Sequence, residues 1–419
     1  MHFLLIYSSP GVLGGIETLI VRMSRWLVNK GHRVTLLVES PENWAHLLPE
    51  DAKCIALGKR FPELYYYYRA QRLWKSLNLP KPDVIKSFDI GSSWIACQLA
   101  AVTGNSSKVL AGIYNPYVFK WYYATESLPF WEAKKLYVNN FLENIPANAR
   151  LFCGVDQIEE LEEVHRRQGM LWPIPIDTRE FDTAARKPKW GKIVSVGRLS
   201  PMKEYNFYMI DVIRALRDKG HDVTWSVYGT GEYESQMRER IKELDLGGSI
   251  SMQGTVPYRC FRQVLADAYV FVGMGTSVLE AALFKVPNVN ALAYDRKGMT
   301  TGSVYQFPRG SIGPGSKSPA NLKVVDEIER ILLLSPAEYR AEEERVGSHV
   351  EVHEMKCSMN RFLQLVRDAD PIEVKKSLYL TNYPLWFLRR VMKRLVRPRE
   401  IGHPASTLPA TMANTGRPS

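Results

Sequence analysis

Two cations, Arg198 and Lys203, stand five positions apart just beyond a predicted buried strand at residues 192–196. Arginine pairs with phosphate oxygens in bidentate fashion, and the lysine ammonium acts as a compact point charge. At the carboxyl end of a strand, such a pair could clamp a diphosphate. Two solvated cations on a surface loop explain the same residues equally well, so the pattern alone leaves both interpretations open.

A carboxylate, Glu280, lies in the first turns of a predicted helix that follows a strand at residues 268–272. The connecting loop is Gly273-Met274-Gly275-Thr276, whose small residues would expose the helix amides at Ser277 and Val278 to a phosphate. Glu280 would point into a cleft and suit the two hydroxyls of a ribose. A carboxylate that merely stabilises the helix dipole is a common alternative.

Glycine turns follow two further predicted strands. The pair Gly14-Gly15 comes directly before a predicted helix, where glycine lets a phosphate approach the backbone amides. A tight strand-to-helix turn explains the pair as well, and the spacing does not match the dinucleotide-binding fingerprint. The turn at residues 228–232, with Thr230 between two glycines, is a weak signal by itself.

An internal repeat indicates the elements that position these residues. Residues 29–38 read NKGHRVTLLV and residues 218–227 read DKGHDVTWSV, and each copy follows an amphipathic stretch. Gly31 and Gly220 stand where a left-handed helix cap is expected, and a β-branched run follows each. Because the joint of a βαβ unit occurs once in each half, the sequence predicts two doubly wound α/β domains.

The expected boundaries follow from this repeat and from shifts in composition. We expect a first domain at residues 1–176, a linker at 177–191 without apolar periodicity, and a second domain at 192–368. Residues 369–399 are expected to form a basic amphipathic helix that Pro384 breaks or kinks, and residues 400–419 a disordered tail. A length of 419 residues suits two domains and a tail.

Composition narrows the class of protein and its location. Five scattered cysteines form no CxxC pair and no cluster with histidine, which favours a reducing cytosol and argues against a zinc site. The short apolar N-terminus is expected to be a buried strand, and no apolar run is long enough to span a membrane. The net charge of +11 is not accompanied by a recognisable nucleic-acid-binding module, so no nucleic-acid partner is expected.

Taken in order, these motifs resemble the retaining glycosyltransferases of the group 1, or family 4, type, which have the GT-B fold. This family includes phosphatidylinositol mannosyltransferases and many enzymes of lipopolysaccharide, O-antigen and capsule assembly. The resemblance spans about residues 1–365 and is strongest in the second domain. It rests on the stretches Gly14-Gly15-Ile16-Glu17, Val196-Gly197-Arg198-Leu199 with Lys203, Tyr228-Gly229-Thr230-Gly231, Gly254-Thr255-Val256, and Leu279-Glu280-Ala281 with Pro287.

The resemblance implies a role for each matching position. Arg198 and Lys203 would bind the donor diphosphate and stabilise the departing nucleotide, and Glu280 would bind the ribose. The first-domain loop at Gly14 and Gly15 and the helix-start amides of Ser277 and Val278 would contact the phosphates, while Thr230 and Gly254 would begin the nucleobase pocket. The implied partners are a nucleotide-sugar donor and a glycan or lipid-linked glycan acceptor, with no metal and no cofactor.

Two positions depart from the family pattern. The family usually carries a glutamate eight residues before Glu280, near the donor sugar, and this chain has Val272 there. The family often has a first-domain histidine near the reacting sugar, whereas the segment after Ile113 is Tyr114-Asn115-Pro116-Tyr117. The donor, acceptor and linkage are therefore left open, and a nucleotide-sugar epimerase of the same fold or a non-catalytic relative are the alternatives. A nicotinamide dehydrogenase would require the absent fingerprint.

The C-terminal segment predicts a location. Residues 372–419 carry nine basic side chains against Glu373 and Glu400, and residues 385–396 place Trp386, Leu388 and Val391 near one helical face. This pattern is typical of a helix in a membrane interface, beside anionic lipid. A helix that packs back on the first domain is the competing interpretation. We expect a cytoplasmic protein with peripheral contact to the inner face of the membrane.

Overall fold

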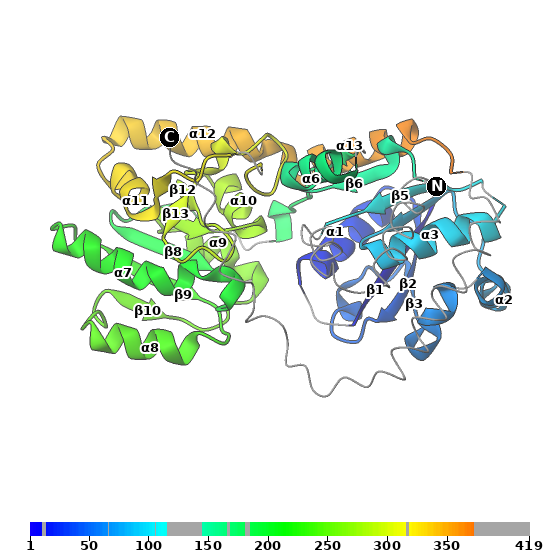
Figure 1. The fold of residues 1–419 in the computed structure, drawn as a ribbon, viewed down its shortest axis with the longest axis horizontal. Helices are drawn as coiled ribbons and strands as arrows, with labels where there is room; N and C mark the ends of the chain where they lie inside the picture. The colour runs from blue at the N-terminus through cyan, green and yellow to red at the C-terminus, as the bar shows by residue number, and fades with distance from the viewer. Residues whose placement is uncertain are drawn as a thin grey trace, which may run out of the picture.

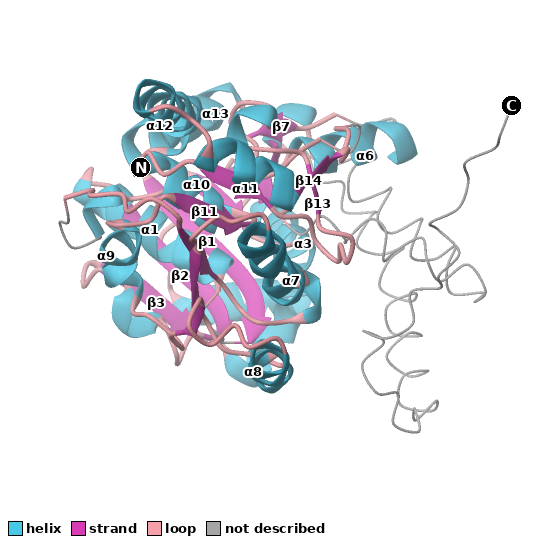
Figure 2. Ribbon diagram, turned by 90° about the vertical axis from the view of Figure 1, so that its left-hand side faces the viewer, coloured by secondary structure: helices cyan, strands magenta, loops and turns pink. Residues whose placement is uncertain are grey.

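The computed structural model describes residues 1–10, 14–65, 67–104, 106–114, 145–165, 168–180, 185–315 and 318–372. These residues form two α/β units, each built around a parallel sheet, which lie side by side in Figure 1. Helices lie on either side of the strands (Figure 2). The predicted fold class of two doubly wound domains is confirmed.

The first domain contains a sheet of seven parallel strands among the described residues, in the order β3-β2-β1-β4-β5-β6-β7. The interior strand β1 is buried along residues 3–7, as expected for a strand covered on both faces. The strands are β1 (His2–Pro10), β2 (Arg33–Ser40), β3 (Ala52–Ala56), β4 (Val84–Ser87), β5 (Lys108–Gly112), β6 (Arg150–Phe152) and β7 (Met170–Leu171).

The second domain contains five parallel strands in the described part of the chain, in the order β10-β9-β8-β11-β12. A short antiparallel pair, β13 and β14, forms a separate two-stranded sheet that an isolated bridge between Ala291 and Thr300 connects to the end of β12. The strands are β8 (Lys192–Val196), β9 (Thr224–Tyr228), β10 (Ile250–Met252), β11 (Val270–Gly273), β12 (Asn288–Asn290), β13 (Met299–Thr300) and β14 (Leu322–Lys323).

Helices connect the strands in both domains. Those of the first half are α1 (Gly15–Asn29), α2 (Tyr67–Leu77), α3 (Ile90–Val102) and α6 (Val155–His165). Those of the second half are α7 (Tyr205–Asp218), α8 (Glu234–Glu243), α9 (Phe261–Leu265), α10 (Thr276–Leu283), α11 (Val324–Leu332), α12 (Pro336–Val350) and α13 (Met355–Asp368).

The repeated joints have the predicted backbone. Gly31 has φ 75° and Gly220 has φ 91°, both in the left-handed region where a side chain is strained. At both joints the residue after the glycine closes the helix by donating to a carbonyl five positions back, His32 to Leu27 at 3.0 Å and His221 to Leu216 at 3.1 Å. The same local sequence therefore ends α1 and α7 in the same way.

The last described helix crosses back to the first domain. α13 contributes Met359, Phe362 and Leu365 to the core around β1, and Phe3 and Phe362 place their ring centroids 6.2 Å apart. In Figure 1, α12 runs over the second domain and α13 over the first. The expected second domain, which ended at residue 368, therefore extends too far. The apolar face of α13 fits either core by pattern, and only packing assigns it to the first.

Two chain segments cross between the domains and are hydrogen-bonded to each other. Ile176 donates to the His353 carbonyl at 2.8 Å, and Met355 donates to the Ile176 carbonyl at 2.9 Å. The His353 side chain is buried and contacts the Ile174 carbonyl through Nδ1 at 3.1 Å. The later end of the expected linker is attached to the second domain. The backbone amides of Lys187 and Lys189 donate hydrogen bonds to the carbonyls of Ala266 and Asp267.

His353 is expected to make the protein sensitive to acid. Burial lowers the pKa of this histidine from 6.5 to about 4 in the folded chain. Between these values the unfolded state takes up a proton that the folded state refuses, so the free energy of unfolding falls as pH falls. We expect this residue to account for a loss of about 3 kcal/mol between pH 6.5 and pH 4.

Urea unfolding of the wild type and of His353→Gln across this pH range measures that contribution. Glutamine retains a polar group that can meet the Ile174 carbonyl but has no proton to gain. The variant should show a shallower decline in unfolding free energy below pH 6.5. Parallel declines in the two proteins would contradict the assignment.

Part of the predicted C-terminal region falls outside the described residues. The basic helix at residues 369–399 is described only as far as Ile372, and the tail at 400–419 is not described. Where the structure does describe the chain, it contains no helix with the length and apolarity needed to cross a membrane.

Candidate functional site

The strand order creates one crevice in each sheet. In the first domain the connections leave β1 in both directions, toward β2 and toward β4, and in the second domain β8 is flanked in the same way by β9 and β11. At such switch points the loops beyond the carboxyl ends of the strands diverge, and open α/β sheets bind ligands there. The loop before α1 follows β1, and the loop before α10 follows β11.

Three predicted site residues meet at the carboxyl edge of the second sheet. The amide of Leu199, the residue after Arg198, donates to the Thr230 carbonyl at 3.0 Å. The Gly197 amide donates to the Tyr228 carbonyl at 2.9 Å, and the Gly229 amide donates to the Gly254 carbonyl at 2.7 Å. The turns that carry Arg198, Thr230 and Gly254 are therefore hydrogen-bonded to one another along this edge of the sheet. We call them the joined strand edge.

This edge requires glycine at Gly229 and Gly231. Their φ angles of 149° and 155° lie in the region that other residues rarely adopt. A Cβ on Gly229 would overlap the carbonyl oxygen of Gly197, and one on Gly231 would overlap that of Leu199. The two turns can pass this closely only because neither carries a side chain at the crossing point.

Lys203 ends a turn of 3-10 helix, Pro201–Lys203, and folds back over the first of these turns. A Cβ on Gly197 would stand 2.5 Å from Lys203 Nζ, so the amine lies directly against the Gly197 backbone. Burial, and then the nearby Arg198 guanidinium, lower the pKa of the Lys203 amine, whereas the Glu280 carboxylate raises it. The structure thus brings Arg198, Lys203 and Glu280 into one electrostatic neighbourhood, with Arg198 exposed.

The start of α10 presents backbone amides. Gly275 precedes it with φ 67°, and no side chain caps the helix. The Ser277 hydroxyl donates to the Met274 carbonyl at 3.1 Å, so it shapes the loop, and Val278 is fully buried in the core of the second domain. Because the first-turn N–H groups of an α-helix have no partner within the helix, those of Ser277 and Val278 can donate to an anion.

Glu280 lies at the contact between the domains. It is 4% exposed, and its Oε1 accepts a hydrogen bond from Arg22 Nη2 of α1 at 3.1 Å. The Tyr258 hydroxyl also donates to Glu280 Oε1 and is bonded to the Arg22 guanidinium. A second nitrogen of Arg22 donates to the Pro175 carbonyl at 3.2 Å, beside the interdomain crossing. Glu280, the carboxylate predicted to bind the ribose, is thus hydrogen-bonded to the first domain.

In the glycine pair of the first domain, one of the two backbone amides already has a hydrogen-bond partner. The Gly14 amide donates to Glu17 Oε2 at 2.9 Å, and Tyr7 donates to Glu17 Oε1 at 2.8 Å. The amide that was expected to contact phosphate is therefore bonded to a carboxylate of its own helix. Gly15 is exposed, with open space where a Cβ would stand.

Sequence reasoning assigned no role to Arg22, Tyr258 or Glu17. For Arg22 a signal was present, because it stands three residues after Leu19 and four before Trp26, which places a cation on the buried face of α1. Such a residue is rarely buried without a specific partner. No comparable pattern marks Tyr258, which is 39% exposed and donates to Glu280 through its hydroxyl.

Of the two departures from the family pattern, Val272 has a structural role, whereas residues 115–117 of the other lie outside the described residues. Val272 is fully buried within β11 and belongs to the core of the second domain. His32 contacts the chain terminus, and His221 contacts Glu329 at 2.9 Å. Within the described ranges no group of three or more His, Cys, Asp or Glu side chains could hold a metal ion.

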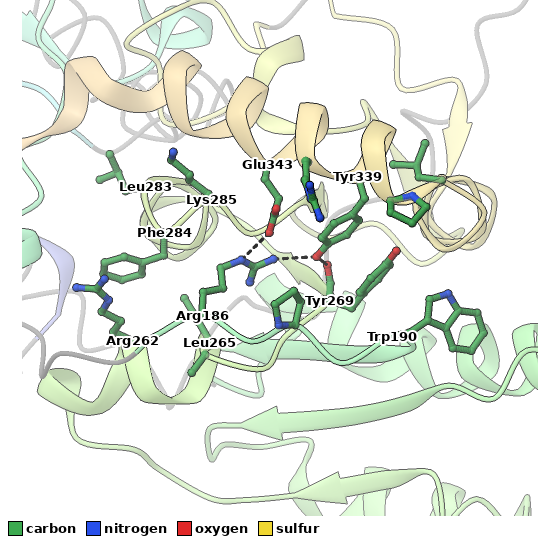
Figure 3. A pocket seen from close by; sticks show the side chains of 15 residues that line it. Arg186, Trp190, Arg262, Leu265, Tyr269, Leu283, Phe284, Lys285, Tyr339 and Glu343 are labelled. Carbon is green, nitrogen blue, oxygen red and sulfur yellow. Dashed lines mark hydrogen bonds and ion pairs between the residues drawn. The ribbon is translucent and has the colours of Figure 1, made fainter.

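A separate pocket of about 820 Å³ lies on the second domain, away from these residues. It is formed by the segment 186–190, α9, the end of α10 and the start of α12 (Figure 3). Arg186 crosses it and donates to Glu343 at 2.9 Å and to the Tyr339 hydroxyl at 2.8 Å, as the dashed lines show. None of the predicted site residues lines this pocket.

Two family models match consecutive parts of the chain. Glycosyltransferase Family 4 matches residues 13–178, and Glycosyl transferases group 1 matches residues 177–332. Their common border at residues 177–178 falls where the chain passes between the domains. No curated protein matches the sequence.

Solved structures with the same architecture cover most of the chain. A glycosyltransferase from Rickettsia africae has a TM-score of 0.61 at 14% identity, covering 87% of this chain and 98% of its own. The lipopolysaccharide outer core galactosyltransferase WaaB has 0.59 at 14% identity, covering 88% and 99%. Anabaena HepE, in complex with UDP and glucose, has 0.56 at 11% identity, covering 87% and 99%. At these identities the likeness shows the fold.

Proposed function

Because the chain belongs to the group 1, or family 4, glycosyltransferases and has their two-domain GT-B fold, we propose that it is a retaining, metal-independent hexosyltransferase. In this proposal it moves a sugar from a nucleotide-sugar donor to a glycan or lipid-linked glycan acceptor. Cell-surface polysaccharide or lipopolysaccharide synthesis is the setting we propose. The observation that carries the proposal is the joined strand edge, where Arg198 and Lys203 lie at the switch point of the second sheet.

The proposed donor group is a nucleoside diphosphate. Arg198, Lys203 and the open start of α10 offer two positive charges and backbone amides near one point. That combination suits two phosphate groups in sequence better than a single carboxylate. Thr230 and Gly254 lie on the same edge and would begin the nucleobase pocket. HepE, a structure of the same fold, binds UDP, so UDP-sugars are the first donors to test.

Chemically, the bond between the sugar anomeric carbon and the diphosphate oxygen breaks, and the acceptor oxygen bonds to that carbon on the same face. The acceptor proton passes to the departing phosphate oxygen. Arg198 and Lys203 would stabilise the charge that grows on the diphosphate, which is the kind of preorganised stabilisation that often dominates catalysis. No protein nucleophile is required, which is consistent with Val272 being a core residue.

A donor screen tests the proposal. Thermal shifts with UDP-, GDP-, ADP- and CDP-sugars identify the donor, and proton NMR of the product reports the anomeric configuration. We expect a product that retains the anomeric configuration of the donor. We also expect that EDTA does not lower the rate at which it forms. An inverted product would overturn the retaining assignment, and loss of activity with EDTA would overturn metal independence. Interconversion of the donor without an acceptor would indicate an epimerase, and the absence of any donor shift would indicate a non-catalytic relative.

We also propose that the protein is cytoplasmic and binds the membrane peripherally through its basic C-terminal segment. The support is the sequence pattern at residues 385–396, with each basic residue near anionic lipid contributing about 1 kcal/mol. Full-length protein should sediment with anionic liposomes at low salt and be released at high salt.

A chain ending at residue 372 is the comparison, because Ile372 is buried in the first-domain core and should be retained. A full-length variant with Arg389, Arg390, Lys393 and Arg394 changed to glutamine keeps the apolar face and removes the charge. Both should lose sedimentation. Equal sedimentation of all three proteins would show that the segment is not the membrane contact.

A further inference from the structure

The contact between Arg22 and Glu280 joins the two domains through buried charges. Their side chains are 3% and 5% exposed, and Nη2 and Oε1 are 3.1 Å apart. Tyr258 lies between them: the Arg22 guanidinium carbon is 5.0 Å from its ring centroid, and its hydroxyl is bonded to both partners. Arg22 belongs to α1 of the first domain, and the other two belong to the second.

We propose that Arg22, Tyr258 and Glu280 form an interdomain latch that keeps Glu280 from the donor, and that nucleotide binding must open it. The inference rests on the proposed function, in which Glu280 binds the donor ribose. In the structure this carboxylate accepts hydrogen bonds from a cation of the first domain and a hydroxyl of the second. These are the kinds of donor that ribose hydroxyls would replace.

Burial makes the two uses of Glu280 exclusive. A carboxylate that is 4% exposed cannot meet a ribose unless a neighbour moves away. Arg22 and Tyr258 are bonded to the same Oε1 atom, so a ribose hydroxyl that donated to this oxygen would have to displace at least one of them. Because Arg22 also donates to the Pro175 carbonyl at the interdomain crossing, its release would be coupled to movement of the domains.

The latch and a supporting role for Arg22 predict opposite effects of Arg22 variants on nucleotide affinity. If only a fraction of molecules has the latch open, the apparent dissociation constant is the intrinsic value divided by that fraction. Removing Arg22 also leaves the Glu280 carboxylate buried without its counter-charge, which favours the open, hydrated arrangement. Arg22 variants should therefore bind nucleotide more tightly. If Arg22 instead held Glu280 in position for the ribose, they would bind it more weakly.

Isothermal titration of Arg22→Met and wild-type protein with UDP, GDP, ADP and CDP tests this directly. We expect the tightest of these nucleotides to bind Arg22→Met at least about tenfold more tightly, within the usual range of coupling between two sites. The association rate should rise as well, since binding no longer waits for opening. Arg25→Met is the matched control, because Arg25 lies on the same helix and donates to the Leu47 carbonyl within the first domain.

Tyr258→Phe gives a second measurement that does not depend on the folding of Arg22→Met. It removes the bridging hydroxyl from a residue that is 39% exposed and keeps the ring against Arg22 and Phe261. A smaller gain in affinity is expected. Unchanged or weaker nucleotide binding by both variants, with clear binding by the wild type, would overturn the latch and leave the proposed function standing. If none of the four nucleotides binds any of these proteins, the proposed function itself fails, and the latch with it.

Discussion

Arg198→Ala is expected to lower turnover by at least about tenfold, because removing one contact to a charge that develops in the transition state typically costs about a hundredfold to a thousandfold. Arg198 is exposed at the carboxyl end of β8, and its charge acts on Lys203. Its backbone is fixed by bonds from both neighbouring residues to the β9 turn. The guanidinium is therefore presented from a rigid edge while its head remains open to a ligand.

The measurement is turnover with the donor identified by the screen, at saturating donor and acceptor. Because the side chain is exposed, the melting temperature of Arg198→Ala should stay close to that of the wild type. Arg238→Ala is the control: this cation lies on α8 and pairs with Glu234 at 2.9 Å within one exposed helix face. If Arg198→Ala turned over at the rate of Arg238→Ala, Arg198 would be only a surface cation.

Gly229→Ala should damage both stability and donor binding. The new Cβ would overlap the Gly197 carbonyl, and φ 149° is strained for alanine. Strain at such a position and forced overpacking each cost roughly 1–3 kcal/mol, so we expect a loss of about 2–5 kcal/mol in unfolding free energy. Relief of the overlap requires the turn that carries Arg198 to move, so the donor KM should rise in the folded fraction.

Thermal unfolding and donor titration check this expectation. Gly248→Ala is the matched control, since Gly248 is exposed, would have no atom within 4 Å of an added Cβ and does not have a positive φ. A Gly229→Ala protein as stable as Gly248→Ala and with an unchanged donor KM would show that the two turns do not need their close approach. If Gly229→Ala had normal stability but a raised donor KM, the turn would be needed for donor binding and not for stability.

The joined strand edge could be predicted because its parts are local. A β-branched run followed by glycine identifies the ends of β8 and β9, and parallel strands place such ends at one edge of a sheet. β8 occupies the residues predicted for it, 192–196, and β11 at Val270–Gly273 overlaps the strand predicted at 268–272. The caps at Gly31 and Gly220 were predictable for the same reason, since each depends on a few consecutive residues.

The hydrogen-bonding partners of individual side chains were harder to predict from the sequence. The sequence marks Gly14 as a turn glycine, but that its amide is bonded to Glu17 depends on Tyr7 orienting the carboxylate from β1. Glu280 was identified as a functional carboxylate, yet nothing near it in the chain indicates that Arg22 and Tyr258 would be its partners. Both outcomes arise from contacts between elements, which periodicity and spacing do not encode.

By itself, the sequence determined two parallel α/β domains and the strand ends at which Arg198, Lys203 and Glu280 stand, because hydrophobic period, glycine position and charge spacing act over a few residues. Tertiary structure alone decided that α13 completes the first domain and that Arg22 reaches Glu280, 258 positions along the chain. The physical reason is that burial of an apolar face or of a charge is decided by whichever surface it meets. That surface exists only once both domains have folded and packed together.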